Sequence, residues 1–221
     1  MWQTKSDSVL EKDVREELLF DPRVDVKAIT VSAKGGVVTL SGSVSSYAAK
    51  LAACHDAERV SGVNVVVEHM DVSLPDMHSR IDADLAKAAT AALRWDVRVP
   101  EGNIKISVRD GWITLDGSVD WQYQRVSADE AVRYLTGVKG VNNMIAVSPV
   151  KRALDVKQHI TDALRRSAET DARAITVETA DGGSVTLRGT IHSWSEREDV
   201  NRAAWATPGV RTVQDELTYA V

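Results

Sequence analysis

The heptapeptide Gly36-Val37-Val38-Thr39-Leu40-Ser41-Gly42 occurs three times in the chain, each time with substitutions. The other copies are Gly111-Trp112-Ile113-Thr114-Leu115-Asp116-Gly117 and Gly183-Ser184-Val185-Thr186-Leu187-Arg188-Gly189, so the copies begin 75 and 72 residues apart. This spacing predicts three units of similar length. Proline follows the same kind of strand pattern at Pro75 and Pro149, and we therefore expect units at residues 1–75, 76–149 and 150–221.

The repeated heptapeptide has the pattern of a β-strand in a hairpin. Val38 and Leu40 alternate with Thr39 and Ser41, which is typical of a strand with one buried face. A shorter alternating run, Ile29-Thr30-Val31, precedes it and is joined to it by a turn that contains glycine. Such a turn between alternating strands predicts a β-hairpin, and the other two copies have the same arrangement.

Two helices and a third strand are predicted around each hairpin. Leu10, Val14 and Leu18 are four residues apart and mark a helix before the hairpin of the first unit. A second helix fits between the heptapeptide and Gly62-Val63, where we expect the third strand to begin. The matching glycines Gly62, Gly137 and Gly209 each come 20 residues after the end of a heptapeptide. The predicted fold class is α+β, with three tandem αββαβ units, each a three-stranded mixed sheet covered on one face by two helices.

The closing glycines of the heptapeptides, Gly42, Gly117 and Gly189, lie inside a strand pattern. Glycine is unfavourable there unless another part of the chain comes too close for a side chain. We interpret these three glycines as positions where a helix crosses the sheet closely.

Composition and charge exclude several classes of protein. None of the three units is basic, and the net charge is −5, which disfavours nucleic-acid binding through phosphate contacts. No apolar run is long enough to span a membrane, and the apolar segment of a secretory signal is missing from the start, which predicts a cytoplasmic protein. Cys54 is the single cysteine, so no intrachain disulfide can form.

The residue types that carry catalysis do not form a recognisable site. The five histidines lack the spacing of a metal site, and the glycine pairs lack the sequence of a phosphate-binding loop. Acidic pairs such as Glu16 with Glu17 fit a solvated helix face better than acid–base catalysis. We therefore predict a non-enzymatic protein without a metal, a cofactor or a small-molecule substrate.

Two sets of residues are candidates for contact with a partner. Trp121 and Trp194, like Tyr47, follow the closing glycines and form either an aromatic rim or ordinary packing within and between units. The third unit also begins with a basic segment that contains Lys151, Arg152, Lys157, Arg165 and Arg166. That segment either contacts anionic lipid headgroups, is a solvated face, or pairs with an acidic helix of a neighbouring unit or subunit.

The three units resemble the BON domain, a family named for bacterial OsmY-type and nodulation proteins. The resemblance rests on the repeated Gly-x-[Val/Ile]-Thr-Leu-x-Gly pattern and on the later Gly-Val-x-x-Val pattern. By this resemblance the signature glycines of the family are Gly42, Gly117 and Gly189, with Gly62, Gly137 and Gly209 before the last strand. The family implies a non-catalytic role in osmotic or envelope stress and binding to phospholipid or other envelope components. Its typical members are exported, whereas the apolar segment of a secretory signal is missing from the start of this sequence. The chain is therefore more similar to a cytoplasmic branch with three units.

Two functions follow as hypotheses. The first is a stress-associated platform of three BON-like units that contacts anionic phospholipid or a protein client. The second is a scaffold or holdase that self-associates through exposed strand edges and unit-specific tryptophans, without a lipid role. In both we expect a homo-oligomer.

Overall fold

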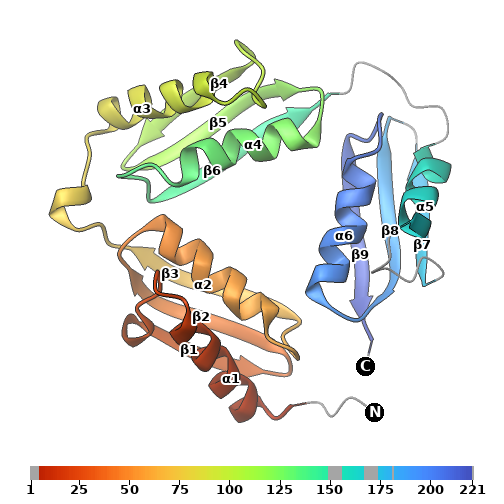
Figure 1. Ribbon diagram of the computed structural model, residues 1–221, viewed down its shortest axis with the longest axis horizontal. Helices are drawn as coiled ribbons and strands as arrows, with labels where there is room; N and C mark the ends of the chain where they lie inside the picture. Colours follow the sequence, from red (N-terminus) through yellow and green to blue (C-terminus); the bar gives the residue numbers. More distant parts are fainter. Residues whose placement is uncertain (1–4, 149–155, 167–173, 181, 221) are drawn as a thin grey trace. The chain divides into compact units, whose positions relative to one another are not determined.

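The computed structural model describes residues 5–148, 156–166, 174–180 and 182–220 (Figure 1). Within them the chain forms three successive αββαβ units of the α+β class, which confirms the predicted fold. Each unit is a three-stranded mixed sheet with two helices over one face, and each is described by itself (Figure 1). The unit boundaries expected after residues 75 and 149 stay a prediction.

The first unit shows the arrangement in full. Its elements are α1 (Asp7–Phe20), the short 3-10 helix η1 (Val26–Ala28), β1 (Ile29–Lys34), β2 (Val37–Val44), α2 (Tyr47–Arg59) and β3 (Val65–Val72). Strand β2 is central: β1 pairs with it antiparallel, with Ile29 opposite Gly42, and β3 pairs with it parallel, with Val37 opposite Val65. The repeated heptapeptide is thus the middle strand of the sheet.

The second and third units repeat this order of elements. After the 3-10 helix η2 (Asp76–His78), the second unit contains α3 (Asp82–Trp95), β4 (Ile104–Arg109), β5 (Trp112–Val119), α4 (Gln122–Arg133) and β6 (Gly140–Val147). The third contains α5 (Val156–Arg166), β7 (Ile175–Ala180), β8 (Ser184–Ile191), α6 (Trp194–Trp205) and β9 (Thr212–Tyr219). The strand orders β4-β5-β6 and β7-β8-β9 place the heptapeptide strand in the middle each time.

The core of each unit lies between the helices and the sheet. In the first unit the predicted helix positions Leu10, Val14 and Leu18 are buried against Val38 and Leu40 of β2. Full burial of such a side chain stabilises the fold by about 1.5–3 kcal/mol. Leu85, Ala89 and Leu93 in the second unit, and Ile160 and Leu164 in the third, are buried in the same way.

The predicted hairpin turns are present, with one difference between units. Gly35 and Gly36 have φ angles of 57° and 82°, and Asp110 and Gly111 have 52° and 82°, as a two-residue hairpin turn with two positive φ angles requires. In the third unit Ala180 lies opposite Ser184, so that turn is one residue longer.

The third strand begins later than we expected. Strand β3 begins at Val65 and β9 at Thr212, after the Gly-Val pair in each case. Gly62 has a φ of 99°, which places it in the turn before the strand, and Val63 is buried. In that turn the carbonyl of Gly36 accepts a hydrogen bond from the Asn64 amide at 2.8 Å. The Gly-Val pair therefore lies in the turn before the strand, and the residue after it bonds that turn to the hairpin.

The interpretation of the closing glycines as helix-crossing points is wrong. A β-carbon added to Gly42 would overlap the backbone carbonyl oxygen of Ala28, just before β1. Gly117 and Gly189 face the carbonyls of Asn103 and Ala174 in the same way. The chain that comes too close is thus the segment that leads into the neighbouring strand, and no α-helix atom is among the nearest neighbours of these three positions.

Candidate functional site

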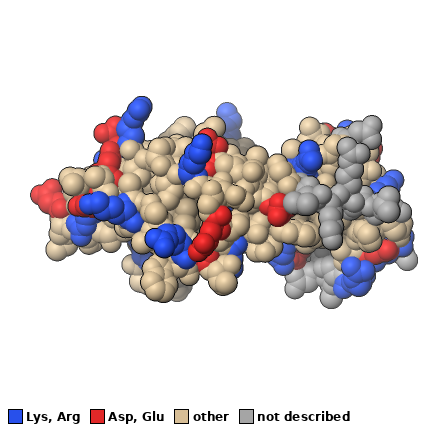
Figure 2. All heavy atoms as spheres, turned by 90° about the horizontal axis from the view of Figure 1, so that it is seen from above, with Lys and Arg blue, Asp and Glu red and all other residues tan. Residues whose placement is uncertain are grey.

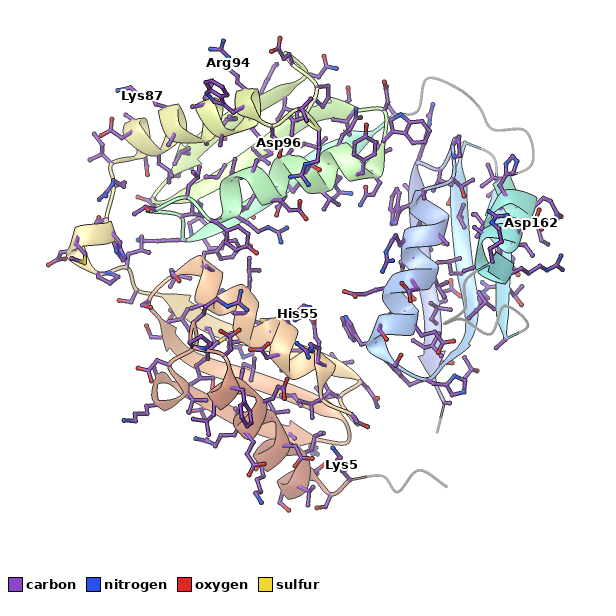
Figure 3. All side chains as sticks on the ribbon, in the orientation of Figure 1. Lys5, His55, Lys87, Arg94, Asp96 and Asp162 are labelled. Carbon is purple, nitrogen blue, oxygen red and sulfur yellow. The ribbon has the colours of Figure 1, made fainter. Side chains whose placement is uncertain are left out.

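The predicted basic segment of the third unit is described only in part. Lys157, Arg165 and Arg166 lie on α5, and all three are exposed. Arg165 Nη1 lies 3.8 Å from Asp162 Oδ1, a weak surface ion pair (Asp162 is labelled in Figure 3). Lys151 and Arg152 lie outside the described residues. The described part of the segment therefore offers three basic side chains to solvent, next to one acidic side chain.

The two candidate tryptophans do not occupy equivalent positions. Trp194 is the first residue of α6, whereas Trp121 lies just before α4, at the position that Ser46 and Ser193 occupy as helix N-caps. A tryptophan cannot accept a hydrogen bond as these serine side chains do. Near the start of α4, Gln124 Oε1 instead accepts hydrogen bonds from the amides of Asp120 and Trp121, both at 3.1 Å. The two tryptophans therefore do not form one repeated aromatic rim.

Trp194 packs inside its own domain. The Arg197 guanidinium carbon lies 5.9 Å from the ring centre of Trp194 and 5.9 Å from that of Tyr219. Arg197 Nε donates to Asp215 Oδ2 at 2.7 Å, and Asn201 donates to the same oxygen at 2.8 Å. The half-buried indole is thus one wall of a polar cluster, which favours the packing alternative for Trp194.

The polar part of this cluster has a counterpart in each unit, and it bonds one amide of the outer edge strand of the sheet. Asp215 Oδ1 accepts a hydrogen bond from the Leu217 amide on the edge strand β9, at 3.0 Å. Glu68 and Asn143, at the matching positions, accept from the amides of Met70 and Ile145. The Arg197 position is Lys50 or Arg125 in the other units, and each of these also contacts its edge strand. One backbone donor on each of these edges is therefore already bonded.

Near the opposite edge, acids at the start of the first helix bond backbone amides of the hairpin in the first and second units. Asp7 accepts from the Gly35 amide at 2.8 Å, and Glu11 accepts from the Ala33 amide of β1 at 2.9 Å. Asp82 accepts from the amides of Asp110 and Gly111. These bonds reduce the number of backbone groups that a second chain could pair with.

Two exposed aromatic residues were not predicted from the sequence. Phe20 ends α1 and is 85% exposed, and Trp95 ends α3 and is 88% exposed. After each comes a rigid turn in which an aspartate accepts both the backbone amide and the side chain of an arginine two residues later. The pairs are Asp21 with Arg23 and Asp96 with Arg98. The turn holds each aromatic ring outward at the end of its helix.

A comparison of the units along the sequence could have found these residues. Phe20-Asp21-Pro22-Arg23-Val24 and Trp95-Asp96-Val97-Arg98-Val99 share an aromatic residue, Asp, Arg and Val at the same spacing. In the first of them, Pro22 indicates the end of a helix, because the residue before a proline is disfavoured in helical geometry. The exposure of the aromatic residue was not predicted, because the sequence does not show on which side of the helix it projects.

The electrostatics of the described surface are mixed. On the face shown in Figure 2, blue and red side chains are interspersed and form no continuous basic area among the described residues. The pKa of Asp21 is lowered to about 2, chiefly by the hydrogen bond from the Arg23 side chain. On the face shown in Figure 2, any attraction to an anionic surface would therefore come from a few side chains and not from a continuous basic area.

The described residues offer little for catalysis. They contain no group of three His, Cys, Asp or Glu that could hold a metal ion. Burial, and secondarily the charges of Glu68 and Glu58, raise the pKa of the Cys54 thiol to about 11, so the thiolate is scarce at neutral pH. None of the helices in the described part of the chain is long and apolar enough to cross a membrane.

The model of the BON domain family matches the chain three times, at residues 6–73, 81–149 and 154–221. The chain therefore belongs to the BON domain family. It is similar to "Osmotically-inducible protein Y" of Escherichia coli (strain K12), with 31% identity over 141 residues, which cover 62% of this chain and 70% of that protein.

Solved structures give only weak similarities. The C-terminal domain of CdsD, a structural protein of the type III secretion system of Chlamydia trachomatis, aligns over 96% of this chain and 98% of its own length, with 14% identity and a TM-score of 0.27. The periplasmic domain of PrgH aligns over 93% and 99%, with 12% identity and a TM-score of 0.22. Scores this low carry no information on function.

Proposed function

We propose that this protein is a non-enzymatic, stress-associated binding protein whose BON domains contact anionic phospholipid. The similarity to a protein named for osmotic induction supports the link to stress. The observation that carries the lipid contact is Trp95, an indole that is 88% exposed at the end of α3 beside Val97, which is 98% exposed. Tryptophan favours the interface between headgroups and acyl chains, and an adjacent apolar side chain adds to the insertion.

Basic side chains next to Trp95 support an anionic lipid in particular. Arg94 directly precedes it, and Lys87 lies two turns earlier on the same helix (both are labelled in Figure 3). Arg98 contributes less, because it is paired with Asp96 at 2.8 Å and with Glu130 at 3.0 Å. Each basic residue close to an anionic membrane contributes about 1 kcal/mol. Arg165 and Arg166 on α5 would add to this attraction.

Co-sedimentation with liposomes tests the proposal. We expect binding to vesicles that contain anionic phosphatidylglycerol, weaker binding to vesicles of phosphatidylcholine alone, and loss of binding at high salt. Trp95→Ala should weaken binding several-fold, because it removes the inserted ring. Arg165→Glu with Arg166→Glu should weaken it by charge reversal.

Two variants serve as matched controls. Tyr134→Ala removes an exposed ring elsewhere in the second unit, and Lys12→Glu with Arg15→Glu makes the same change in net charge on α1. Both should bind as the parent protein does. Binding that is absent, or that responds to the control variants as much as to the test variants, would contradict the proposal.

Self-association as a scaffold or holdase is the alternative function. The feature that favours it is an exposed apolar surface on α4, where Tyr123 and Val126 are 55% and 39% exposed, together with Tyr134 directly after the helix, which is 61% exposed. Analytical ultracentrifugation of the parent protein and of Tyr134→Ala tests it. Oligomers that weaken in the variant would support the alternative, and a monomer at high concentration would contradict it.

A further inference from the structure

A pocket in the first domain contains a buried acid, one of whose carboxylate oxygens has no hydrogen-bond partner among the described residues. The pocket has a volume of about 430 Å³ and lies where the end of α1 and the following turn meet the last turn of α2. It is lined by Glu17, Phe20, Asp21, Pro22, Arg23, Asp56 and Arg59. All of its lining residues belong to this domain.

Asp56 is the unusual member of this set. Its side chain is only 6% exposed, and its Oδ2 atom is buried with no hydrogen-bond partner among the described residues. A buried carboxylate oxygen without a hydrogen-bond donor is strongly unfavourable. The nearby guanidinium of Arg23 donates its Nε and Nη2 hydrogens to Asp21, and none of its hydrogens is bonded to Asp56 Oδ2.

The fold itself does not require this acid. Ala131 in the second domain and Ala203 in the third occupy the position that corresponds to Asp56, counted from the closing glycines. In the second domain the Asp–Arg turn is completed by Glu130, whose Oε2 accepts from Arg98 at 3.0 Å. The counterpart of Glu130 in the first domain is His55 (labelled in Figure 3). Where the second domain has a surface network of Asp96, Arg98 and Glu130, the first domain has a buried carboxylate oxygen of Asp56 without a donor.

The surroundings of Asp56 determine which group could supply the donor. Glu17 and Asp21 bring two further carboxylates to the pocket, so a positively charged donor is favoured over a neutral one. The ring of Phe20 is exposed and lines the same pocket, and it can contact an alkyl chain or the cation itself. Arg59 gives the lining one further cationic side chain, which disfavours a ligand with a large excess of positive charge.

We propose that this pocket binds a primary alkylammonium group, with the nitrogen donating to Asp56 and the alkyl chain lying against Phe20. Such a group is carried both by small free amines and by the lysine side chain of a protein. The site is independent of the lipid contact proposed for Trp95, because it lies on a different domain.

Protonation is the competing way to satisfy Asp56. Burial, followed by the charge of Asp21, raises the pKa of Asp56; Glu17 also raises it, whereas His55 and Arg23 lower it. A proton on Asp56 could be donated to Asp21. Protonation removes the negative charge that attracts an ammonium group and leaves a weaker neutral acceptor, so amine affinity should fall as the pH is lowered and Asp56 becomes protonated.

NMR titration of the full chain with butylamine tests the proposal. We expect saturable amide shifts confined to residues 17–23 and 55–59, and none with 1-butanol, which lacks the charge. Asp56→Asn should lower the affinity roughly tenfold or more, as expected for loss of a charged hydrogen bond. Phe20→Ala should lower it several-fold while leaving Asp56 in place. Glu16→Gln, an exposed acid on α1 outside the pocket, should not change it.

Nα-acetyl-lysine N-methylamide, which keeps a free side-chain ammonium group, is titrated in parallel. It distinguishes the two sources of the group. Tighter binding of the lysine derivative than of butylamine would identify a protein side chain as the ligand, and the opposite order would identify a small free amine. The proposal is overturned if butylamine gives no saturable shifts, or if Asp56→Asn and Glu16→Gln bind it equally well. A failure of lipid binding would leave this test unaffected.

Discussion

Gly117→Val should remove most of the stability of the second domain. A β-carbon at this position overlaps the backbone carbonyl oxygen of Asn103, and the φ of +140° is a conformation that residues with side chains rarely adopt. Backbone strain costs about 1–3 kcal/mol and overpacking about the same, so we expect a loss of about 3 kcal/mol or more. A domain of about 70 residues has only about 4–10 kcal/mol in total.

Urea unfolding followed by circular dichroism measures this loss, and a second glycine provides the control. Gly35→Asp introduces at a turn the residue that the second domain already has there as Asp110, and nothing lies within 4 Å of the added β-carbon. We expect a change of about 1 kcal/mol or less. Equal effects of the two substitutions would show that the contact with the neighbouring strand is not what requires glycine.

Asp215→Ala should produce the second largest effect, in the third domain. The substitution removes three hydrogen bonds at once, those from Arg197, Asn201 and the Leu217 amide. Hydrogen bonds to a charged group contribute about 1.5–3 kcal/mol, and this group is partly buried, so we expect a loss of about 2–3 kcal/mol. Thermal unfolding of the variant would show it as a lower midpoint for this domain.

The adjacent residue on the same strand is the matched control. Glu216 pairs with Arg188 at 2.7 Å, but both side chains are about half exposed. Surface ion pairs contribute about 0–1 kcal/mol, so Glu216→Ala should have little effect. A loss for Glu216→Ala as large as for Asp215→Ala would contradict the role assigned to the edge cluster.

The effect of Asp215 should also depend on pH. Burial alone would raise its pKa, but the hydrogen bonds from Arg197, Asn201 and Leu217 outweigh burial and lower it. A carboxyl with a lowered pKa stabilises the fold above its unfolded pKa of about 3.9, and this contribution is lost as the pH falls through the folded value. The difference between the parent protein and Asp215→Ala should therefore shrink below about pH 4.

The sequence was sufficient for the architecture because the three units provide independent copies of one pattern. Alternation around Val38 and Leu40 and the spacing of Leu10, Val14 and Leu18 are local consequences of strand and helix geometry, so they predict which faces are buried. What approaches Gly42 is not local in this sense. The carbonyl of Ala28 comes close only through the pairing of β1 with β2, and the sequence shows that space is missing there without showing what occupies it.

The candidate sites were harder to predict for a related reason. Charge can be counted along α5, but the exposure of Trp95 depends on the turn that follows it. That turn is fixed by hydrogen bonds between Asp96 and Arg98. Asp56 is a similar case, because an aspartate in an Ala-rich helix gives no sign in the sequence that its carboxyl group is buried. In both cases the decisive property is the surroundings of a side chain, which depend on tertiary packing.

The hydrogen bonds to the edge-strand amides have a consequence for a chain that carries three copies of one domain. Sister domains joined by short connections meet one another at an effective concentration of the order of millimolar, far above that of any separate partner. Similar edge strands at that concentration could pair across domains during folding, which is a known way for repeated domains to misassemble. The carboxyl and amide groups of Glu68, Asn143 and Asp215 bond an edge amide within each domain. These bonds favour strand pairing within each domain over pairing between domains. Three similar copies can therefore fold in one chain.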